Sequence, residues 1–299
     1  MPELPDVAIY VESLARHVVG RRLLRTRVKS PFVLRSVTPP LSACDGRTVR
    51  GIERLGKRIV IAFEGDLFLV VHLMISGRLR WRAPGAAIPA TIGLAAFDFE
   101  SGTLLFTEAS KKKRASLHVI AGKDALAQHD RGGLEPLVCT SSEFAERLRL
   151  ENHTLKRALT DPTLFSGIGN AYSDEILHRA RLSPVTHTRK LDDDAVERLF
   201  QATRTTLTEW IERTRAEVGD GFPEDVTAFR PQMAVHGKFG KPCPDCGTKV
   251  QRIVYAENES NYCPRCQTGG KLLADRALSR LLRGDWPKTV EELEERKRG

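Results

Sequence analysis

The sequence predicts an α+β fold, in which a helix and many short strands are followed by a mainly helical region and a small cysteine-rich hairpin. The first observation is an amphipathic pattern over residues 5–20, which has one apolar face and ends at Gly20. The second is a series of short apolar segments between about residues 22 and 120. The third is helical spacing of apolar residues from about residue 135. A helix followed by many short strands indicates a β-sandwich or barrel with the helix packed on it.

The strand segments are recognised by their β-branched and apolar content. Residues 58–63 and 66–75 are two such runs, and the sequence EGD between them predicts a hairpin turn. Residues 95–106 repeat this design, with Ser101 and Gly102 at the turn.

The second part of the chain shows helical periodicity. The first of its helices has a predicted capping box that begins at Ser141 or Ser142 and uses Glu146. The expected helices span residues 141–150, 153–161, 170–182 and 192–218.

The last stretch, residues 271–299, predicts two further helices. The first is amphipathic and carries Leu278, Leu281 and Leu282, which we expect to pack against the helical region. The second is short, with Thr289 and Glu292 as its cap.

Composition limits the class of protein. The chain has 299 residues, which is enough for about two domains, and it has neither a long apolar run nor an apolar signal region, so we expect a cytoplasmic protein without a membrane span. Its net charge of +9 favours a polyanionic partner, with nucleic acid ahead of a membrane surface. Cys44 and Cys139 stand alone in the sequence and are expected to be ordinary buried thiols.

Two cysteine pairs carry the clearest chemical signal. Cys243 and Cys246 are followed, after sixteen residues, by Cys263 and Cys266. Four thiolates at this spacing can close a tetrahedral Zn²⁺ site, and a site with four protein ligands is structural because it leaves no open position. The segment between the pairs suits a β-hairpin. From residue 238 to 271 there are six basic and three acidic residues, so the hairpin suits phosphate binding, although such ribbons also bind proteins.

The sequence SGIGNAY, residues 166–172, predicts a glycine turn that leads into a helix. Gly167 and Gly169 allow a close approach of the backbone to a phosphate, and the helix that follows offers its N-terminus to the anion. Asn170 lies at this start, where it either caps the helix or touches a phosphate. On its own the motif is weak, because helical hairpins with such turns are common.

The first six residues, MPELPD, allow a structural and a chemical interpretation. Pro5 is well placed to begin a helix, and acidic residues near a helix start suit its dipole. Alternatively, removal of Met1 would expose the secondary amine of Pro2. An α-amino group has a pKa near 7.7–8.0, so part of it is neutral at pH 7 and can attack a sugar C1′. Glu3 and Asp6 would then supply acid–base catalysis.

Two further segments become informative only in combination with the first. Lys57 starts a predicted strand, where a lysine is usually a solvated edge residue. In HLMISG, residues 72–77, His72 is either a satisfied polar residue or a ligand-contacting one. Met74 and Ile75 suit a core equally well, or a wedge that enters a DNA base stack.

The order of these motifs resembles the formamidopyrimidine-DNA glycosylase/endonuclease VIII (Fpg/Nei) family of base-excision repair enzymes. The resemblance runs from MPELPD to CPRCQ, about nine-tenths of the chain. It implies an N-terminal β-sandwich, a helix–two-turn–helix domain and a zinc finger. The expected domains are residues 1–125 (catalytic), 135–235 (helix–two-turn–helix), 236–270 (zinc finger) and 271–299 (C-terminal extension).

The resemblance implies a role for each matching residue. Pro2 matches the nucleophile that forms a Schiff base, Glu3 the catalytic acid and Lys57 a phosphate-binding lysine. Asp6 stands where many members have glutamate. The residues that match DNA contacts are His72, Met74, Ile75, Lys156 and Asn170, and the metal ligands would be the four paired cysteines.

The implied activity is that of a bifunctional DNA glycosylase/AP lyase acting on damaged double-stranded DNA as a monomer. It would flip the damaged nucleotide out of the duplex, remove the base and cleave the strand by β,δ-elimination. Two alternatives remain. One is a DNA-binding protein that keeps the fold without the chemistry. The other is an enzyme that acts on abasic sites or oxidised pyrimidines and hardly on 8-oxoguanine.

Several positions depart from the family pattern. The usual zinc-finger arginine is replaced by Asn258, for which Arg252 is a candidate substitute. The family sequence HLGMSG reads HLMISG here, and Ile75 takes the slot of the methionine. The basic segment 111–114 lacks the aromatic residue of the family loop PRRFG, so we expect a different opposite-base preference. The segment 219–229 is short for a lid over 8-oxoguanine.

Overall fold

The structure is a computed structural model that describes the chain except for residues 225, 228, 256–257, 275–286 and 297–299. It divides into two compact units. Unit 1 comprises Met1–Gly133 and Glu209–Ala228, and unit 2 comprises Leu134–Thr208 and Phe229–Gly299. The boundary lies within helix α6 (Asp193–Val218). The α+β class is confirmed.

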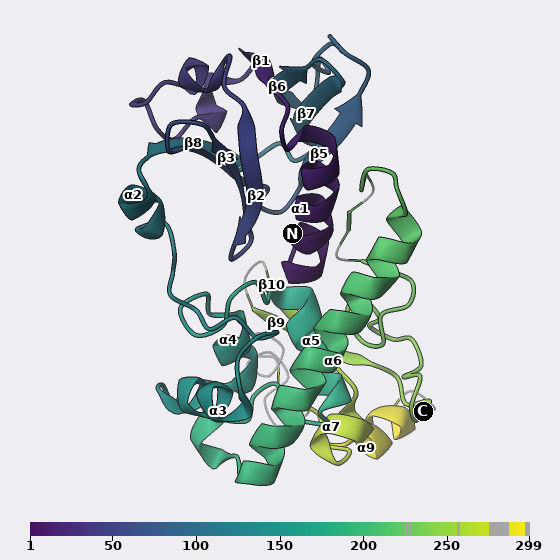
Figure 1. Cartoon of the computed structure of the whole chain (residues 1–299). Coiled ribbons are helices and arrows are strands. Elements are labelled where there is room, and N and C mark those ends of the chain that lie inside the picture. Colours follow the sequence, from purple (N-terminus) through teal and green to yellow (C-terminus); the bar gives the residue numbers. More distant parts are fainter. Residues whose placement is uncertain (225, 228, 256–257, 275–286, 297–299) are drawn as a thin grey trace. The chain divides into compact units, whose positions relative to one another are not determined.

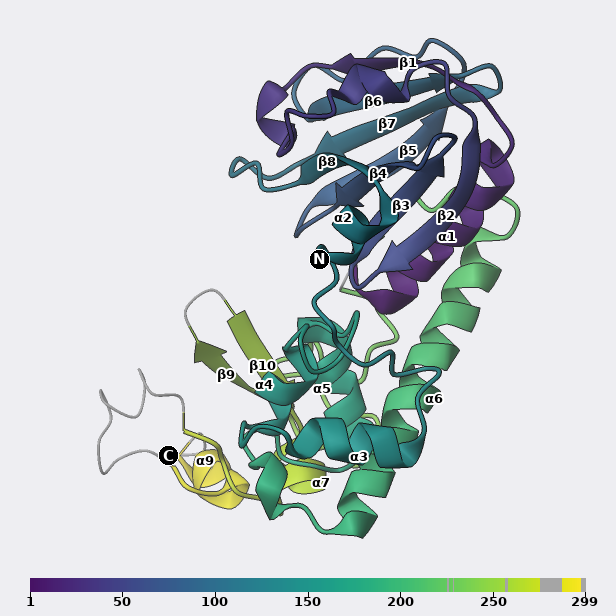
Figure 2. The same ribbon diagram turned by 60° about the vertical axis from the view of Figure 1, so that its left-hand side comes forward.

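Unit 1 is a β-sandwich of two four-stranded antiparallel sheets, which Figure 2 shows as stacked layers. Their strand orders are β1-β6-β7-β5 and β2-β3-β4-β8. The strands are β1 (Leu23–Val28), β2 (Val49–Leu55), β3 (Arg58–Phe63), β4 (Leu67–His72), β5 (Gly77–Arg82), β6 (Gly93–Phe99), β7 (Gly102–Glu108) and β8 (Ser116–Ala121). Three short elements complete the unit: η1 (Pro31–Val33), η2 (Leu41–Cys44) and α2 (Lys123–Ala127).

Helix α1 (Leu4–Val18) packs on the sandwich beside β2 (Figure 1). It ends just before Gly20, which has φ +76°, as the sequence predicts. Its apolar face, including Val7, Leu14 and Val18, joins the inward-facing side chains of both sheets in one core. The apolar side chains that recur every 3.6 residues in the helix and every second residue in the strands therefore pack together in one core.

The strand register brings the ends of three neighbouring strands together at one end of the second sheet. Arg58 at the start of β3 lies opposite His72 at the end of β4, and His72 lies opposite Ser116 at the start of β8. The predicted strand 66–75 is too long, because β4 ends at His72 and a turn follows. In this turn Met74 has φ +52°, which no strand residue adopts.

Unit 2 is helical, and the predicted helices are present with ends shifted by a few residues. They are α3 (Ser141–Arg149), α4 (Leu155–Thr160), α5 (Asn170–Arg179) and the first part of α6. A short 3-10 helix that was not predicted, η3 (Thr188–Lys190), precedes α6. The predicted cap of the first helix is wrong. Thr140, not Ser141 or Ser142, accepts from the N–H of Glu143, and the Glu143 carboxylate accepts from the N–H of Thr140. Thr140 is favoured because its partner lies three residues on, which a capping box requires.

The rest of unit 2 is the cysteine-rich ribbon. Strands β9 (Gln251–Tyr255) and β10 (Asn258–Tyr262) form the expected hairpin, which lies against α5 (Figure 2). Two short helices, α7 (Pro264–Thr268) and α9 (Val290–Glu295), follow. Thr289 caps α9 by accepting from the N–H of Glu292, as predicted. The predicted helix with Leu278, Leu281 and Leu282 lies outside the described residues.

Among the described residues, no helix is both long enough and apolar enough to cross a membrane.

Candidate active site and metal centre

The N-terminal motif is buried at the start of α1. Pro2, Glu3 and Asp6 are all buried, with Glu3 and Asp6 exposing 2% and 1% of their surface. The backbone N–H of Glu3 donates to Oδ2 of Asp6 at 2.9 Å, which satisfies one of the open N–H groups of the helix start. Asp6 therefore stabilises the start of the helix, as its position in the sequence predicts. The same hydrogen bond keeps the Asp6 carboxylate beside Glu3.

The terminal amino group lies in an environment that favours its neutral form. Burial lowers the pKa of the Met1 amino group, and the nearby positive charges of Arg78 and Lys57 lower it further. The carboxylates of Glu3 and Asp6 act in the opposite direction but do not outweigh burial. The fold thus brings the predicted Lys57, Glu3 and Asp6 to the chain terminus. Arg78 is a member of this group that the sequence analysis missed, because one arginine in a strand carries no motif.

Lys57 and His72 lie at the same end of the second sheet, where β3 begins and β4 ends. Lys57 occupies the turn between β2 and β3, and His72 ends β4 opposite Arg58. Burial lowers the pKa of His72 to about 4, with contributions from the charges of Arg58 and Lys57. His72 is therefore neutral at pH 7, and as a neutral imidazole it can still donate one N–H to a phosphate oxygen.

The turn after β4 presents the two predicted wedge residues differently. Ile75 is 54% exposed, whereas Met74 is partly buried. The turn is held tight by Gly77, whose N–H donates to the carbonyl of Leu73 at 2.8 Å. A Cβ on Gly77 would lie 2.2 Å from that oxygen, so the position excludes every other residue.

A buried carboxylate ties this turn to the basic loop 110–114. Glu108 is 1% exposed and accepts from the backbone N–H groups of Arg114 and Ala115 at 3.0 and 3.1 Å. The hydroxyl of Ser76 lies 3.5 Å from the same carboxylate and accepts from the N–H of Ser110. The loop is therefore ordered by its backbone, while its side chains from Lys111 to Arg114 are exposed.

Phe222 and Glu224, which follow α6 within unit 1, contact the β-sandwich. Glu224 pairs with Arg82, whose Nη2 lies 2.7 Å from Oε2, and Arg80 lies 3.5 Å from the same carboxylate. Phe222 packs its ring against Tyr10 and Trp81. These two residues belong to the segment that the sequence analysis considered as a short lid.

In unit 2, Lys156 and Asn170 are brought together. The ammonium of Lys156 on α4 donates to the carbonyl of Asn170 at 2.6 Å and to Oδ1 of Asp174 at 2.5 Å. Asn170 is the first residue of α5, and Gly169 takes the cap position, so Asn170 does not cap the helix. A phosphate contact remains the predicted role of Asn170.

Asp174 is the centre of a buried network that the sequence analysis missed. It also accepts from His236, Ser260 and Asn261, and the neighbouring Glu175 accepts from the backbone of residues 234–236. Burial alone would raise the pKa of Asp174, but the charge of Lys156 and the hydrogen bond from His236 lower it. Two consecutive acids in the middle of α5 are the signal in the sequence.

The four paired cysteines meet at one point of the ribbon. Their sulfur atoms all lie within 4.8 Å of one another, with Sγ–Sγ distances of 3.9 Å for Cys243–Cys266 and 3.4 Å for Cys246–Cys263. A tetrahedral Zn²⁺ with bonds of about 2.3 Å places its sulfurs about 3.8 Å apart. The set fits one structural zinc. Two of its members, Cys243 and Cys263, are almost fully buried.

The zinc hairpin carries one preorganised arginine. Arg252 on β9 lies over the ring of Phe239, 4.5 Å from its centre, and pairs with Glu259 at 3.2 Å. Its side chain is 45% exposed, so its remaining N–H groups are open to an anion. Asn258 begins β10 opposite Tyr255.

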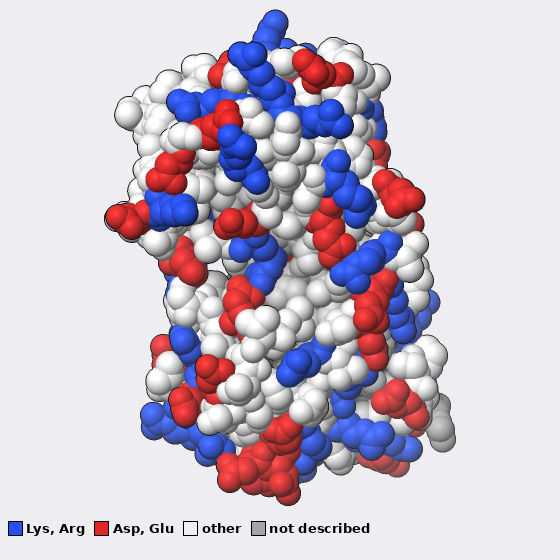
Figure 3. Space-filling view, viewed as in Figure 1, with Lys and Arg blue, Asp and Glu red and all other residues white. Residues whose placement is uncertain are grey.

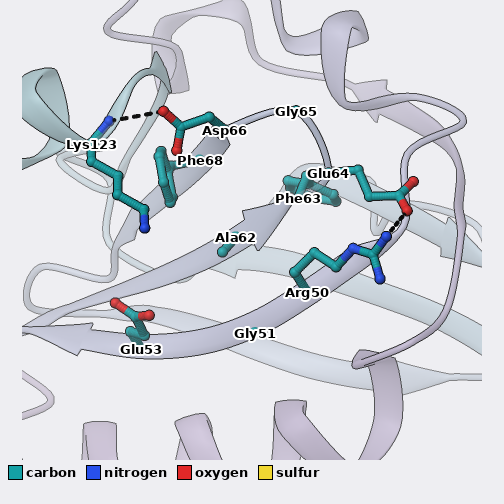
Figure 4. Close-up of a pocket in the computed structure, with 10 residues that line it drawn as sticks. All are labelled: Arg50, Gly51, Glu53, Ala62, Phe63, Glu64, Gly65, Asp66, Phe68 and Lys123. Carbon is teal, nitrogen blue, oxygen red and sulfur yellow. Dashed lines mark hydrogen bonds and ion pairs between the residues drawn. The ribbon is translucent and has the colours of Figure 1, made fainter.

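A surface hollow of unit 1 is lined by none of the predicted site residues. Figure 4 shows it on the outer face of the second sheet, about 550 Å³ in volume, between β2, β3 and Lys123. Its charged residues include Arg50, which pairs with Glu64. On the face drawn in Figure 3, basic and acidic side chains are interspersed.

Known family models match three parts of the chain. Residues 1–118 match the formamidopyrimidine-DNA glycosylase N-terminal domain, 133–220 its H2TH domain and 240–269 a zinc finger found in FPG and IleRS. These matches define a DNA-repair glycosylase with a structural zinc finger.

Whole-length relatives agree with this class. A formamidopyrimidine-DNA glycosylase of Solibacter usitatus is 31% identical over 89% of this chain and 99% of its own length. One of Thermus thermophilus is 32% identical over 90% and 100%. The chain belongs to the formamidopyrimidine-DNA glycosylase (Fpg) family, whose members are DNA glycosylases with AP lyase activity.

Solved structures support the same assignment. The fold is similar to Lactococcus lactis Fpg bound to abasic-site DNA, with a TM-score of 0.79, 25% identity and coverage of 89% and 99% of the two chains. It is also similar to MutM bound to DNA with a carbocyclic 8-oxo-G, with a TM-score of 0.78, 25% identity and coverage of 89% and 100%.

Proposed function

We propose that this chain is a bifunctional DNA glycosylase/AP lyase that uses the imino nitrogen of Pro2 as its nucleophile once Met1 is removed. The observation that carries the proposal is the burial of Pro2 together with Glu3 and Asp6 at the start of α1. In the chain that still carries Met1, burial also lowers the pKa of the Met1 amino group at this place. A neutral amine beside a proton donor is the arrangement that nucleophilic displacement at a sugar carbon needs.

The chemistry follows from these groups. The Pro2 nitrogen attacks C1′ of the flipped nucleotide and the C1′–N bond to the base breaks. The base leaves with that electron pair and takes up the proton that the new ammonium centre loses. Glu3 donates a proton to the sugar ring oxygen, and the opened sugar becomes an iminium. The iminium acidifies the C2′ proton, whose removal expels the 3′ phosphate; a second elimination expels the 5′ phosphate. Water then hydrolyses the iminium and frees Pro2.

The remaining predicted residues would bind DNA. In this proposal Lys57 and neutral His72 would contact phosphates, and Asn170 would offer a phosphate the start of α5, where it is the first helical residue. Arg252, stacked on Phe239, supports the proposal that it replaces the usual zinc-finger arginine. Zinc would hold the ribbon in shape through its four cysteines. We propose a monomer that acts on damaged double-stranded DNA in the cytoplasm.

Borohydride trapping tests the proposal. Reduction of the imine in the presence of abasic-site duplex should link the wild-type protein to DNA, and Pro2→Gly should lose most of the product. Lys29→Gln, which changes an exposed lysine on unit 1, is the matched control and should trap like the wild type. Tight binding of the duplex without any trapped product would instead support a DNA-binding protein without the chemistry.

A second candidate function is a preference for oxidised pyrimidines or abasic sites over 8-oxoguanine. Two observations favour it: the loop 110–114 carries no aromatic residue, and Phe222 and Glu224, from the segment considered as a lid, contact Trp81 and Arg82 of the sandwich. Excision rates on duplexes with 8-oxoguanine, thymine glycol or an abasic site, each opposite all four bases, decide between the two. Fastest excision of 8-oxoguanine opposite cytosine would remove this candidate.

A further inference from the structure

His178 contacts a zinc ligand from outside the ribbon. It lies in the last turn of α5, is 4% exposed, and its Nε2 is 3.2 Å from Sγ of Cys243. Oδ2 of Asp245 lies 3.9 Å from the same nitrogen, which is too far for a hydrogen bond, and Sγ of Cys266 lies within 4.8 Å of a ring nitrogen of His178. The imidazole therefore faces the sulfur.

The chemistry of the metal site determines what His178 does there. Four thiolates around one Zn²⁺ leave a net charge of −2, and the sulfur of Cys243 is buried. A lone pair of Nε2 against that anionic sulfur would be repulsive at 3.2 Å, whereas an N–H would be attractive. Cys263 has a donor within the ribbon, the backbone N–H of Cys266 at 3.5 Å. For Cys243 the side-chain donor comes from α5.

We propose that His178 is a positioning residue of the zinc centre. Its Nε2–H donates to the Cys243 thiolate, so that zinc binding by the ribbon and the packing of α5 against the ribbon stabilise each other. The same helix holds the ribbon through Asp174 and Glu175, and it begins at Asn170. The contact between His178 and Cys243 thus links α5 directly to the zinc site. The proposal concerns the metal centre and does not depend on the Pro2 chemistry.

The matched variants are His178→Phe, which keeps the ring volume and removes the donor, and His178→Gln, which keeps an N–H of similar reach. His153→Phe is the control, since His153 pairs with Glu151 and does not belong to the group of residues around the four cysteines. The readout is the apparent zinc affinity of the full-length protein in competition with a chromophoric chelator. Partners of metal ligands typically contribute 10- to 100-fold in affinity. We expect roughly a 10-fold or larger loss for His178→Phe, a smaller loss for His178→Gln and no change for His153→Phe.

A measurement on the wild-type holoprotein tests the same contact without any variant. Long-range ¹H–¹⁵N correlation of the His178 ring reports which nitrogen carries the proton, and we expect Nε2–H. The Co²⁺-substituted protein should show the charge-transfer bands of four sulfur ligands. A proton on Nδ1 alone, a Co²⁺ spectrum of three sulfurs and one nitrogen, or unchanged zinc affinity in His178→Phe would each overturn the proposal.

Discussion

Replacement of Asp174 by asparagine is the substitution for which the structure gives the sharpest stability prediction. The Asp174 side chain is fully buried and accepts from Lys156 at 2.5 Å, His236 at 2.8 Å and Asn261 at 3.1 Å. Asparagine keeps the shape, but it removes the charge and turns one acceptor oxygen into a donor. The Lys156 ammonium, with only 16% of its side chain exposed, then loses its counter-charge.

The magnitude follows from the loss of one partner of a buried pair, which typically costs about 3–5 kcal/mol. Because Lys156 keeps some access to water, we expect Asp174→Asn to lower the free energy of unfolding of unit 2 by about 3 kcal/mol. Urea unfolding with zinc held constant measures this change. Asp194→Asn, at an exposed position of α6, is the control and should change stability by no more than about 1 kcal/mol.

A double-mutant cycle isolates the pair. If Lys156 and Asp174 stabilise each other, Lys156→Gln should cost much less in the Asp174→Asn background than in the wild type. A loss below about 1 kcal/mol for Asp174→Asn, or additive effects in the cycle, would refute the role assigned to this network.

Three further predictions concern other parts of the molecule. Because the folded-state pKa of His72 is about 4 and its ordinary value is about 6.5, acidification from pH 6.5 towards 4 should destabilise unit 1 by up to about 3 kcal/mol more in the wild type than in His72→Gln, as measured by urea unfolding. Lys57→Gln should reduce the slope of log K against log salt for duplex binding by about 0.9, the value for one phosphate contact, whereas an unchanged slope would exclude that contact. Removal of zinc by a chelator should abolish the hydrogen-exchange protection of β9 and β10 while leaving the sandwich strands protected.

Much of the fold follows from local sequence patterns. The helix that begins after Glu3 has a proline in its first turn, an acidic residue at its third position and a period of 3.6, so neighbours in the chain determine it. The zinc ligands are equally predictable, because the spacing within each cysteine pair already fixes a tight turn.

Other features depend on residues far apart in the chain. The apolar run 66–75 gives no sign that β4 ends at His72, since the turn is set by the close approach of Gly77 to Leu73. The pairing of Asp174 with His236 and the contact of His178 with Cys243 join positions more than sixty residues apart. Side-chain contacts between residues this far apart in the chain leave no periodic pattern in a single sequence.

The central claim is that the nitrogen of Pro2 forms the covalent bond to the sugar. The most direct test is borohydride trapping on abasic-site DNA, followed by nuclease and protease digestion and tandem mass spectrometry of the linked peptide. We expect the reduced sugar on the N-terminal nitrogen of a chain that starts at Pro2. A sugar attached to Lys57 or to another lysine, or active protein that still carries Met1, would contradict the account.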